Sequence, residues 1–285
     1  MPLRLCRREF LSGFLRKHSS ELRSGELPKD MYQNYIFDLY GTLVDIRTDE
    51  EKEEVWEKLS LFYGYYGAYY EAGELKDWYK KLVEKQTGNR AEKEERTKGY
   101  AGISCEAYPE IQIEKVFLKL FELEGISADE GLSINAGQFF RLLSTEYIRL
   151  YPGAMKMLRN IKENGGKIYL LSNAQRIFTA FEMKYLKLTD YFDGILLSSD
   201  YGVKKPEKRF FELLLESYQL KPEESIMTGN DELCDIWGAQ QAGMDTCYIH
   251  SSISPEYTGL VKPVYRVMEP DFEKVYSLIT GKKMR

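Results

Sequence analysis

Histidine and cysteine are both scarce in this sequence of 285 residues. The two histidines, His18 and His250, are too few for a multi-histidine metal site, and they nearly exclude chemistry built on a histidine base. The four cysteines show no C-x-x-C spacing, which predicts reduced thiols in a cytoplasmic protein rather than a disulfide framework or a zinc site. Any catalysis is therefore expected to depend on carboxylates, hydroxyls and lysines.

The sequence also lacks a long apolar run and a large excess of charge. No stretch approaches the ~18 uninterrupted apolar residues of a membrane span, so we expect no membrane association. The 40 basic and 45 acidic side chains give a formal net charge of −5, which provides no general reason to bind nucleic acid. With 43% apolar residues, the chain can bury one sizeable core and a smaller attached domain.

Residues 1–30 differ in charge from the rest of the chain. They contain seven basic and four acidic side chains, a local charge of +3, and the remainder carries −8. The pair Arg7-Arg8 resembles the start of a twin-arginine export signal, but the basic cluster at 16–18 interrupts the apolar run that such a signal needs. We interpret residues 1–30 as a basic extension in front of the folded domain.

Beyond this extension, the periodicity of apolar residues changes twice. A short β-prone run ends at Asp38, and the convincing segments that follow it are helical. Short apolar strands and helices then alternate, which is the pattern of parallel β-α units with helices on both faces of a sheet. We therefore predict an α/β fold with a doubly wound, mostly parallel sheet formed by 31–46 and 151–285, and an all-α cap inserted at 47–150.

Local signals predict where several helices begin. The sequence Thr-Asp-Glu-Glu at 48–51 is typical of a capping box at the start of the first cap helix. Pro206 is typical of the first position of a helix, which predicts a helix over 206–218. The apolar pattern predicts a further helix over 235–242.

Polar side chains follow several of the predicted strands. Because ligands of a doubly wound sheet bind beyond the carboxyl ends of its strands, these residues are the candidates for a functional site. They are Asp38, Ser172, Asn173, Ser198, Ser199, Asp200, Asn230 and Asp231, with Lys205 and Asp235 slightly further along the chain. Carboxylates, a small hydroxyl and a lysine at one rim suit a phosphate group and a hard cation such as Mg²⁺. One carboxylate can then attack a substrate covalently while the lysine and the metal offset its charge.

Four segments resemble, in order, the motifs of the haloacid dehalogenase (HAD) superfamily. The first is Asp-Leu-Tyr-Gly-Thr-Leu-Val-Asp at 38–45, and the second is Leu-Leu-Ser-Asn-Ala at 170–174. The third is Lys-Lys-Pro at 204–206, and the fourth is the acidic D-x-x-x-D pattern within 229–236. The resemblance covers about residues 34–250 and implies a HAD-like core with a helical cap. Each motif alone is weak, but four motifs in order, each at a predicted strand end, are specific.

The resemblance implies catalytic and substrate-binding roles for the matching residues. Asp38 would be the nucleophile, Ser172 would hydrogen-bond the transferring group, and Lys205 would stabilise the negative charge of that group. Thr42 and Asn173 would line the substrate pocket. Lys205 is favoured over its neighbour in the same motif because it precedes the proline.

The resemblance also implies a metal site for Mg²⁺. Its ligands would be the carboxylates of Asp38 and Asp231 together with the backbone carbonyl of Tyr40, a role that any side chain at this position permits. Asp235 would be a further ligand or would hold a ligand water. The side chain of Tyr40 would contribute to the substrate pocket.

Tyr40 departs from the pattern of the HAD phosphatases. They usually have an aspartate two residues after the nucleophile, which protonates the leaving alcohol and then deprotonates the attacking water, a pairing normally worth ~10²–10⁴ in rate. A tyrosine, with an unperturbed pKa of about 10, is a poor base at pH 7. Tyrosine here is typical of the 2-haloacid dehalogenases, whose halide leaves without a proton, and phosphonate-cleaving and ATPase relatives also lack the aspartate.

Two features favour a phosphatase over a dehalogenase. The dehalogenases are metal-independent and do not keep a paired acidic fourth motif, whereas Asp231 and Asp235 are both present. They also carry an arginine early in the cap, and residues 61–79 contain none. We therefore expect a Mg²⁺-dependent phosphatase that acts on a small phosphorylated metabolite as a monomer or homodimer. The alternatives are a 2-haloacid dehalogenase-type hydrolase and a catalytically weakened HAD-like binding protein.

Overall fold

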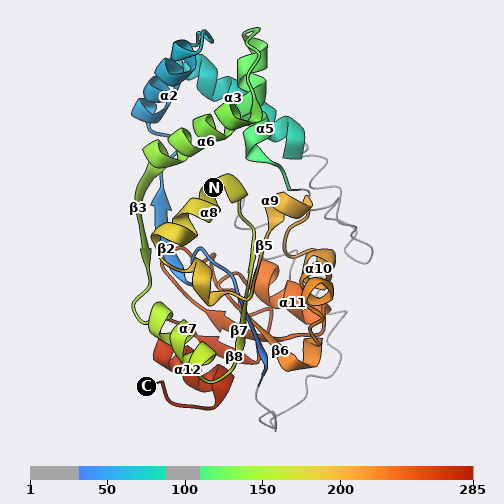
Figure 1. The fold of residues 1–285 in the computed structure, drawn as a ribbon. Helices are drawn as coiled ribbons and strands as arrows, with labels where there is room; N and C mark the ends of the chain where they lie inside the picture. Colours follow the sequence, from blue (N-terminus) through green and yellow to red (C-terminus); the bar gives the residue numbers. More distant parts are fainter. Residues whose placement is uncertain (1–31, 88–109, 285) are drawn as a thin grey trace.

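The computed structural model describes residues 32–87 and 110–284, and it shows an α/β core that carries a helical cap at one end (Figure 1). The basic extension predicted at 1–30 lies outside the described residues. Among the helices within the described ranges, none is long and apolar enough to cross a membrane.

The core sheet has the strand order β5-β4-β1-β6-β7-β8, and all of its pairings are parallel. Its strands are β1 (Asn34–Phe37), β4 (Lys167–Ser172), β5 (Gly194–Leu197), β6 (Ser225–Gly229), β7 (Asp245–Ile249) and β8 (Tyr265–Val267). All four residues of β1 are buried, as expected for a parallel strand covered on both faces. Because β1 lies between β4 and β6, the next residue, Asp38, emerges near the middle of the sheet.

Helices cover both faces of this sheet. They include α7 (Ala154–Glu163), α12 (Phe272–Thr280), α10 (Lys208–Tyr218) and α11 (Gly238–Gln241). Tyr35 and Phe37 pack in one apolar cluster with residues of α7 and α12. Ile36, between them in the strand, packs in a second cluster with residues of α10 and α11. This alternation follows the two-residue period of a strand, and it confirms the predicted doubly wound α/β sheet.

The cap has an apolar core of its own. In the described residues it contains α2 (Glu53–Tyr65), α3 (Ala72–Thr87), α5 (Ile113–Leu123) and α6 (Glu130–Ser144). Its centre is aromatic, with ring centroids 5.3 Å apart for Trp56 and Phe140 and 4.2 Å apart for Tyr63 and Phe121. Ile177, which belongs to the core helix α8 (Arg176–Tyr185), joins the same cluster and ties the cap to the core.

Two antiparallel strands form the connection between the cap and the core. β2 (Val44–Thr48) pairs with β3 (Thr145–Leu150). The all-α segment predicted at 47–150 is therefore wrong at its two ends. β3 mixes apolar and charged residues and is at least partly exposed along its length, and its partner lies on the far side of the cap in sequence. Helical periodicity within the insertion gives no sign of that pairing.

The first cap helix begins later than predicted. α2 starts at Glu53, with no side-chain cap at its first turn, rather than at the capping box expected over 48–51. Asp49 instead accepts a hydrogen bond from the backbone N–H of Glu51 at 3.0 Å. The carboxylate of Glu51, which a capping box would have turned back to the start of the helix, instead pairs with Lys76 and Lys80 of α3.

Two helices of the core also differ from the prediction. α10 begins at Lys208, and Pro206 lies before it, in a turn with a cis Lys205-Pro206 peptide bond. The helix predicted over 235–242 is divided into the π-helical turn η5 (Glu232–Trp237) and the short α11. Both differences arise in the segments that carry the third and fourth motifs, where the backbone is shaped to bring polar groups together.

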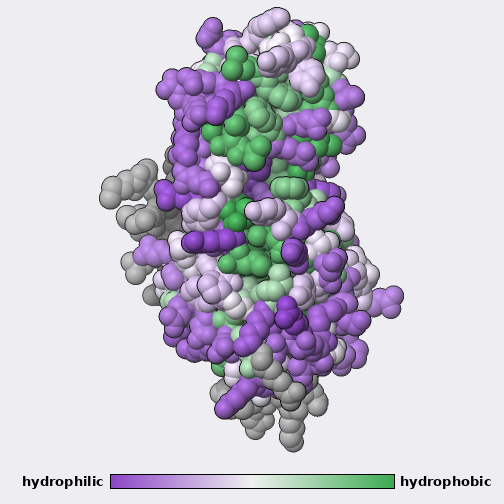
Figure 2. All heavy atoms as spheres, turned by 60° about the vertical axis from the view of Figure 1, so that its left-hand side comes forward, coloured by the Kyte–Doolittle hydropathy of each residue, from purple (hydrophilic) through white to green (hydrophobic). Residues whose placement is uncertain are grey.

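Helix α8 (Arg176–Tyr185) lies between the cap and the core sheet (Figure 1). It packs against α6 of the cap. Both helices expose apolar side chains, including Leu142 on α6 and Phe181 and Tyr185 on α8. On the corresponding side of the molecule, Figure 2 shows apolar side chains at the surface of the cap and of the core. α8 is thus the element through which contacts of the cap reach the core.

Candidate active site

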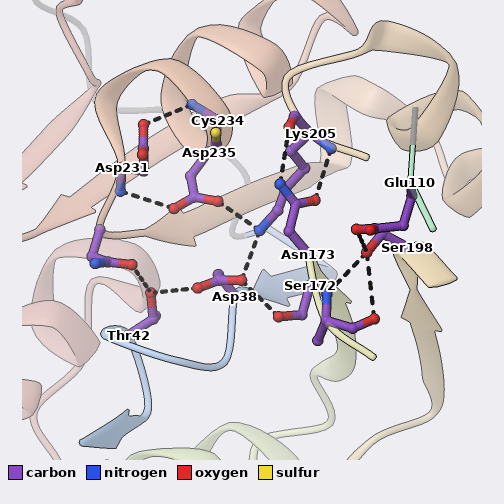
Figure 3. A network of polar contacts seen from close by, with 12 residues as sticks. Asp38, Thr42, Glu110, Ser172, Asn173, Ser198, Lys205, Asp231, Cys234 and Asp235 are labelled. Carbon is purple, nitrogen blue, oxygen red and sulfur yellow. Dashed lines mark hydrogen bonds and ion pairs between the residues drawn. The ribbon is translucent and has the colours of Figure 1, made fainter. Parts of the chain in front are cut away.

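Two donors hold the carboxylate of Asp38 at the end of β1. Lys205 Nζ lies 2.7 Å from Asp38 Oδ1, and Ser172 Oγ donates to the same oxygen at 2.9 Å (Figure 3). Ser172 is the last residue of β4, the neighbour of β1, and Lys205 lies in the turn before α10. Asp38 is 7% exposed and Lys205 only 2%. The structure therefore brings the three residues predicted as catalytic into direct contact, and it places Lys205 rather than Lys204 at the carboxylate.

Thr42 lies beside the other oxygen of Asp38. Its Oγ1 is 3.4 Å from Asp38 Oδ2, at the long end of the hydrogen-bond range, and 3.2 Å from Asn230 Oδ1. The turn that carries it contains Gly41 at a φ of +82°, where a Cβ would lie 2.4 Å from Asn230 Nδ2. Only glycine combines this conformation with so close an approach. Thr42 thus lies beside the nucleophile, and its role in lining the substrate pocket stays a prediction.

Asn173 is bonded to the backbone of Lys205. Its Nδ2 donates to the backbone carbonyl of Lys205 at 2.9 Å, and its Oδ1 accepts from the backbone N–H of Lys205 at 2.8 Å (Figure 3). Both functional groups of the amide are therefore used to fix the backbone of the lysine. This support of Lys205 was not predicted, and the pocket-lining role expected for Asn173 stays a prediction.

The two acidic residues of the fourth motif are engaged in different ways. Asp231 Oδ1 accepts from the backbone N–H groups of Leu233 and Cys234, at 2.8 and 2.9 Å, and so caps η5. Asp235 Oδ2 accepts from the N–H of Asp231 at 2.9 Å, and its Oδ1 lies 2.7 Å from Lys205 Nζ. Asp235 is 1% exposed and uses both oxygens within the protein. This favours the indirect role of Asp235, as a support for its neighbours, over direct metal ligation.

The charges of the site do not balance. The carboxylates of Asp38 and Asp231 both act on the buried carboxyl of Asp235, and among the described residues the ammonium group of Lys205, which meets Asp38 and Asp235, is the cation that opposes them. Burial raises the pKa of the Asp235 carboxyl to about 7, and the two other carboxylates add to this while Lys205 opposes it. Burial lowers the pKa of Lys205, but the attraction of Asp235 and Asp38 outweighs it and raises that pKa above its ordinary value.

This charge pattern fits a divalent cation. An excess of negative charge at close range is costly unless a cation lies among the carboxylates. Within the described ranges, no group of three or more His, Cys, Asp and Glu side chains is arranged to hold a metal ion. Mg²⁺ needs fewer, because it is usually bound through one or two carboxylates and keeps several waters. Asp38 and Asp231 thus offer donors of the kind that Mg²⁺ prefers, and the metal site expected from them and the Tyr40 carbonyl stays a prediction.

The side chain of Tyr40 contacts the cap and α8. Its hydroxyl donates to Glu182 and lies 3.0 Å from Thr179 Oγ1, both on α8. The guanidinium carbon of Arg141, from the cap helix α6, lies 5.7 Å from the centre of the Tyr40 ring. Burial and the Glu182 carboxylate raise the pKa of the Tyr40 hydroxyl well above its ordinary value.

Sequence reasoning missed Glu182, Thr179 and Arg141. One available signal was the i, i+3 spacing of Thr179 and Glu182, which puts two polar side chains on one face of the helix. Arg141 lies in the last turn of α6, outside the early part of the cap where an arginine was sought.

The remaining polar residues at strand ends hold the second motif and its surroundings. Ser198 Oγ accepts from the N–H of Ala174 at 2.9 Å and donates to Glu110, a cap residue, at 2.7 Å. Ser199 Oγ accepts from the N–H of Arg176 at 2.9 Å, at the start of α8. These contacts join the loop after β4 to the cap and to the end of β5, which is a structural role.

Comparison with known proteins agrees with the geometry of the site. The sequence model of the haloacid dehalogenase-like hydrolases matches residues 32–243. A glyceraldehyde 3-phosphate phosphatase of Pyrococcus furiosus is 35% identical over 102 residues, which are 36% of this chain and 42% of that protein. A phosphoserine phosphatase of Thermus thermophilus is 28% identical over 143 residues, 50% of this chain and 56% of that protein. The chain spans about half the length of these curated relatives.

Among solved structures, the 2-haloacid dehalogenase of Pseudomonas syringae pv. Tomato DC3000 has the same fold. It aligns with a TM-score of 0.56 at 18% identity and covers 87% of this chain and 98% of its own. The fold, the converging motif residues and the family match over most of the sequence lead to one assignment. The chain belongs to the haloacid dehalogenase-like hydrolases.

Proposed function

We propose that this hydrolase is a Mg²⁺-dependent phosphatase that acts on a small phosphorylated metabolite through an aspartyl phosphate on Asp38. The observation that carries this proposal is the position of Asp38, between the ammonium group of Lys205 and the hydroxyl of Ser172. The lysine adds positive charge where the negative phosphoryl group would be transferred. The relatives named as phosphatases support the same chemistry.

The reaction has two displacements. An oxygen of Asp38 attacks phosphorus, the bond from phosphorus to the leaving oxygen breaks, and that oxygen keeps the electron pair and takes up a proton. Water then attacks phosphorus, the bond to Asp38 breaks, and the carboxylate and inorganic phosphate are released. Ser172 and Lys205 hold the carboxylate in one orientation through both steps.

Asp38, Asp231 and the Tyr40 carbonyl would hold the Mg²⁺ ion. Bound there, it would offset the negative charges of the carboxylates and of the phosphoryl group. Asp235 fixes the backbone N–H of Asp231 and the ammonium group of Lys205, so it orients one proposed ligand and one catalytic group.

A 2-haloacid dehalogenase-type reaction is the second candidate, and the observation in its favour is Tyr40. A halide leaves without a proton, so a site with a tyrosine two residues after the nucleophile suffices for it. The charge pattern disfavours this candidate, because a metal-independent enzyme would keep the carboxylates of Asp38, Asp231 and Asp235 close together with only Lys205 to offset them. A catalytically weakened binding protein is the third candidate, and it would bind a phosphorylated ligand without turnover.

One assay panel distinguishes the three candidates. The full-length protein is incubated with p-nitrophenyl phosphate in Mg²⁺ and in a chelator, and separately with a 2-halopropionate. We expect phosphate release that requires Mg²⁺ and is lost in Asp38→Asn, with no halide release. Halide release that persists in the chelator would support the dehalogenase instead. Phosphate binding without turnover of either substrate would support the binding protein.

We propose a cytoplasmic setting. Neither Cys234 nor Cys247 forms a disulfide within the described residues, and reduced thiols are typical of that compartment. The ligand is proposed to be a small molecule rather than a nucleic acid or a membrane, and the active form a monomer or a homodimer. Size-exclusion chromatography with light scattering tests the last point.

A further inference from the structure

Arg141 and Glu182 form an ion pair between the cap and the core. Arg141 Nε lies 2.7 Å from Glu182 Oε1, and its Nη2 lies 3.3 Å from Oε2, so the guanidinium meets the carboxylate in two-pronged fashion. Glu182 is 6% exposed, and the side chain of Arg141 is 18% exposed. Such a two-pronged pair fixes direction as well as distance, and its burial limits screening by salt.

The loop that carries Asp38 meets the same ion pair. Glu182 accepts a hydrogen bond from the hydroxyl of Tyr40, two residues after Asp38. Arg141 lies over the Tyr40 ring at 5.7 Å and over the ring of Phe178, on α8, at 5.3 Å. Thus a cap helix, a core helix and the nucleophile loop are joined at one buried point.

The segment between Tyr40 and Asp38 is short and internally bonded. The carbonyl of Leu39 accepts hydrogen bonds from the N–H groups of Leu43 and Val44, at 2.8 and 2.9 Å. Leu39 is itself 1% exposed. Few backbone rotations are therefore free between Tyr40 and Asp38, and a displacement of the Tyr40 ring should also move the backbone of Asp38.

We propose that Arg141 and Glu182 are positioning residues for the nucleophile. By holding Tyr40, they set the orientation of the turn that carries Asp38, and they make that orientation depend on the docked position of α6. The proposal deepens the proposed function and rests on it for its kinetic consequence. Misplacement of a reacting group by about 1 Å can cost roughly 100-fold in rate, so the expected effect falls on kcat more than on KM.

A second contact between the cap and the core provides the comparison. Gln175, at the start of α8, donates to the carbonyl of Ile111 at 2.9 Å and accepts from the N–H of Ile113 at 3.0 Å. It also donates to Glu110 at 3.1 Å. This contact ties the cap to α8 at the opposite end from Tyr40. Gln175→Ala therefore loosens the cap without removing a partner of Tyr40.

The first measurement needs no substrate. Hydrogen–deuterium exchange is followed in the peptide that covers residues 38–48, in the wild type and in Arg141→Met, Tyr40→Phe and Gln175→Ala. We expect Arg141→Met and Tyr40→Phe to raise exchange there by about 10-fold, a local opening of the loop. Gln175→Ala should raise exchange at 110–113 instead. Unchanged exchange of 38–48 in folded Arg141→Met would overturn the proposal.

The second measurement is steady-state kinetics with p-nitrophenyl phosphate. Arg141→Met should lower kcat roughly 10- to 100-fold with KM changed less than about 3-fold. The double variant Arg141→Met/Tyr40→Phe should have a kcat close to that of the single variants, because both changes break the same chain of contacts. In Arg141→Met/Gln175→Ala, by contrast, the two reductions in kcat should multiply, because the two changes act on separate contacts. Multiplying effects in the first pair, or a change in KM alone, would contradict the proposal.

The test has one control variant in an exposed ion pair and one alternative variant in case Arg141→Met does not fold. Arg209 and Glu216 form an exposed pair on α10 at 2.7 Å, and Arg209→Met should leave both measurements unchanged. If Arg141→Met does not fold, Arg141→Met/Glu182→Gln removes both buried charges and keeps an amide oxygen to accept from Tyr40. A wild type without phosphatase activity would refute the proposed function, and the exchange measurement would still decide the positioning role.

Discussion

The side-chain amide of Asn173 makes two hydrogen bonds with the backbone of Lys205, donating to its carbonyl and accepting from its N–H. The ammonium group of Lys205 lies between the carboxylates of Asp38 and Asp235, so the backbone of the lysine has to be positioned as accurately as the ammonium group. The second motif therefore acts partly by placing the third. Lys205 lies on a turn, and it is held there by Asn173, the residue that follows strand β4.

The first prediction concerns these two hydrogen bonds. Asn173→Asp keeps an acceptor for the Lys205 N–H but loses the donor to its carbonyl, and it adds a negative charge near the site. We expect kcat for p-nitrophenyl phosphate to fall roughly 10- to 100-fold, because displacement of a charged group by a fraction of an ångström weakens its interaction with the transferring group. Steady-state kinetics measures this.

Lys204→Met serves as the control, because it removes the other lysine of the third motif. Its kcat should remain within about 2-fold of the wild type, as for surface substitutions in general. Equal losses in Lys204→Met and Lys205→Met would show that the motif acts through its total charge rather than through the placement of Lys205.

The second prediction concerns the leaving group. The raised pKa of Tyr40 makes its hydroxyl a weak proton donor at pH 7, so substrates that need protonation of the leaving oxygen should react slowly. We expect aryl phosphates to be hydrolysed much faster than alkyl phosphates. Tyr40→Asp should then raise the ratio of alkyl to aryl turnover, a comparison that tolerates a general loss of activity.

A new carboxylate at position 40 would lie near Glu182, so Tyr40→Asp/Glu182→Gln is the cleaner variant for this test. It removes the like charge while leaving Arg141 with an amide oxygen as partner. If both substrate types respond equally to the new acid, another group already protonates the leaving oxygen and the role assigned to Tyr40 is wrong.

The third prediction concerns the metal. Asp231→Asn should weaken Mg²⁺ binding and activity at least about 10-fold, since a neutral amide is a poorer ligand for a hard cation than a carboxylate. Asparagine is as good an N-cap as aspartate, so the N–H groups of Leu233 and Cys234 keep their acceptor and η5 should persist. Isothermal titration calorimetry gives the affinity, and thermal melting checks the fold.

Asp129→Asn is the matched control for this change. Asp129 caps α6 by accepting from the N–H of Leu132 at 2.7 Å, away from the site. Its Mg²⁺ affinity should equal that of the wild type. Unchanged Mg²⁺ binding in Asp231→Asn would place the ion elsewhere.

The fourth prediction concerns pH and Glu207. Burial raises the pKa of this carboxyl, and its Oε2 is buried with no hydrogen-bond partner in the described part of the chain. A raised folded pKa means that the folded state holds the proton more tightly. The free energy of unfolding therefore falls as pH rises from the unfolded pKa of about 4.3 through the raised folded value. Glu207→Gln removes this dependence.

Thermal melting across that pH range tests the prediction. The Tm of Glu207→Gln relative to the wild type should increase as the pH rises. Glu216 provides the opposite case, because its hydrogen bond from Arg209 lowers its pKa, so Glu216→Gln should lose stability relative to the wild type above the unfolded pKa. A parallel response of the two variants would show that the burial of Glu207 does not control its titration.

The parts of the site that the sequence predicts are those that follow from strands. Asp38, Ser172 and Lys205 lie at or just after strand ends or beside a proline, and parallel strands bring such positions to one edge. Their mutual contact follows from the order of the strands and did not require side-chain detail. The family resemblance then supplied their proposed roles.

The parts that the sequence does not predict depend on contacts between distant segments. Arg141 and Glu182 lie on different helices, and helical periodicity describes each helix without saying which one it meets. Asp235 was predicted at the rim, but its two engaged oxygens follow from the π-helical turn, which has no recognised signal in composition. Similarly, β2 and β3 can pair only when the folded insertion brings its two ends together.

The β2–β3 ribbon makes the cap an insertion that leaves the core and returns to it at one place. Val44 lies opposite Leu150, and Thr48 opposite Thr145, so the chain leaves the core and returns to it through adjacent residues. Antiparallel neighbours of this kind can be joined by a two-residue turn. In evolutionary terms, insertions of very different size can be exchanged at this point without rethreading a single strand of the core sheet. The specificity of such an enzyme can therefore change by replacement of a whole module, provided that the new module keeps a side chain that meets Tyr40 and Glu182 as Arg141 does.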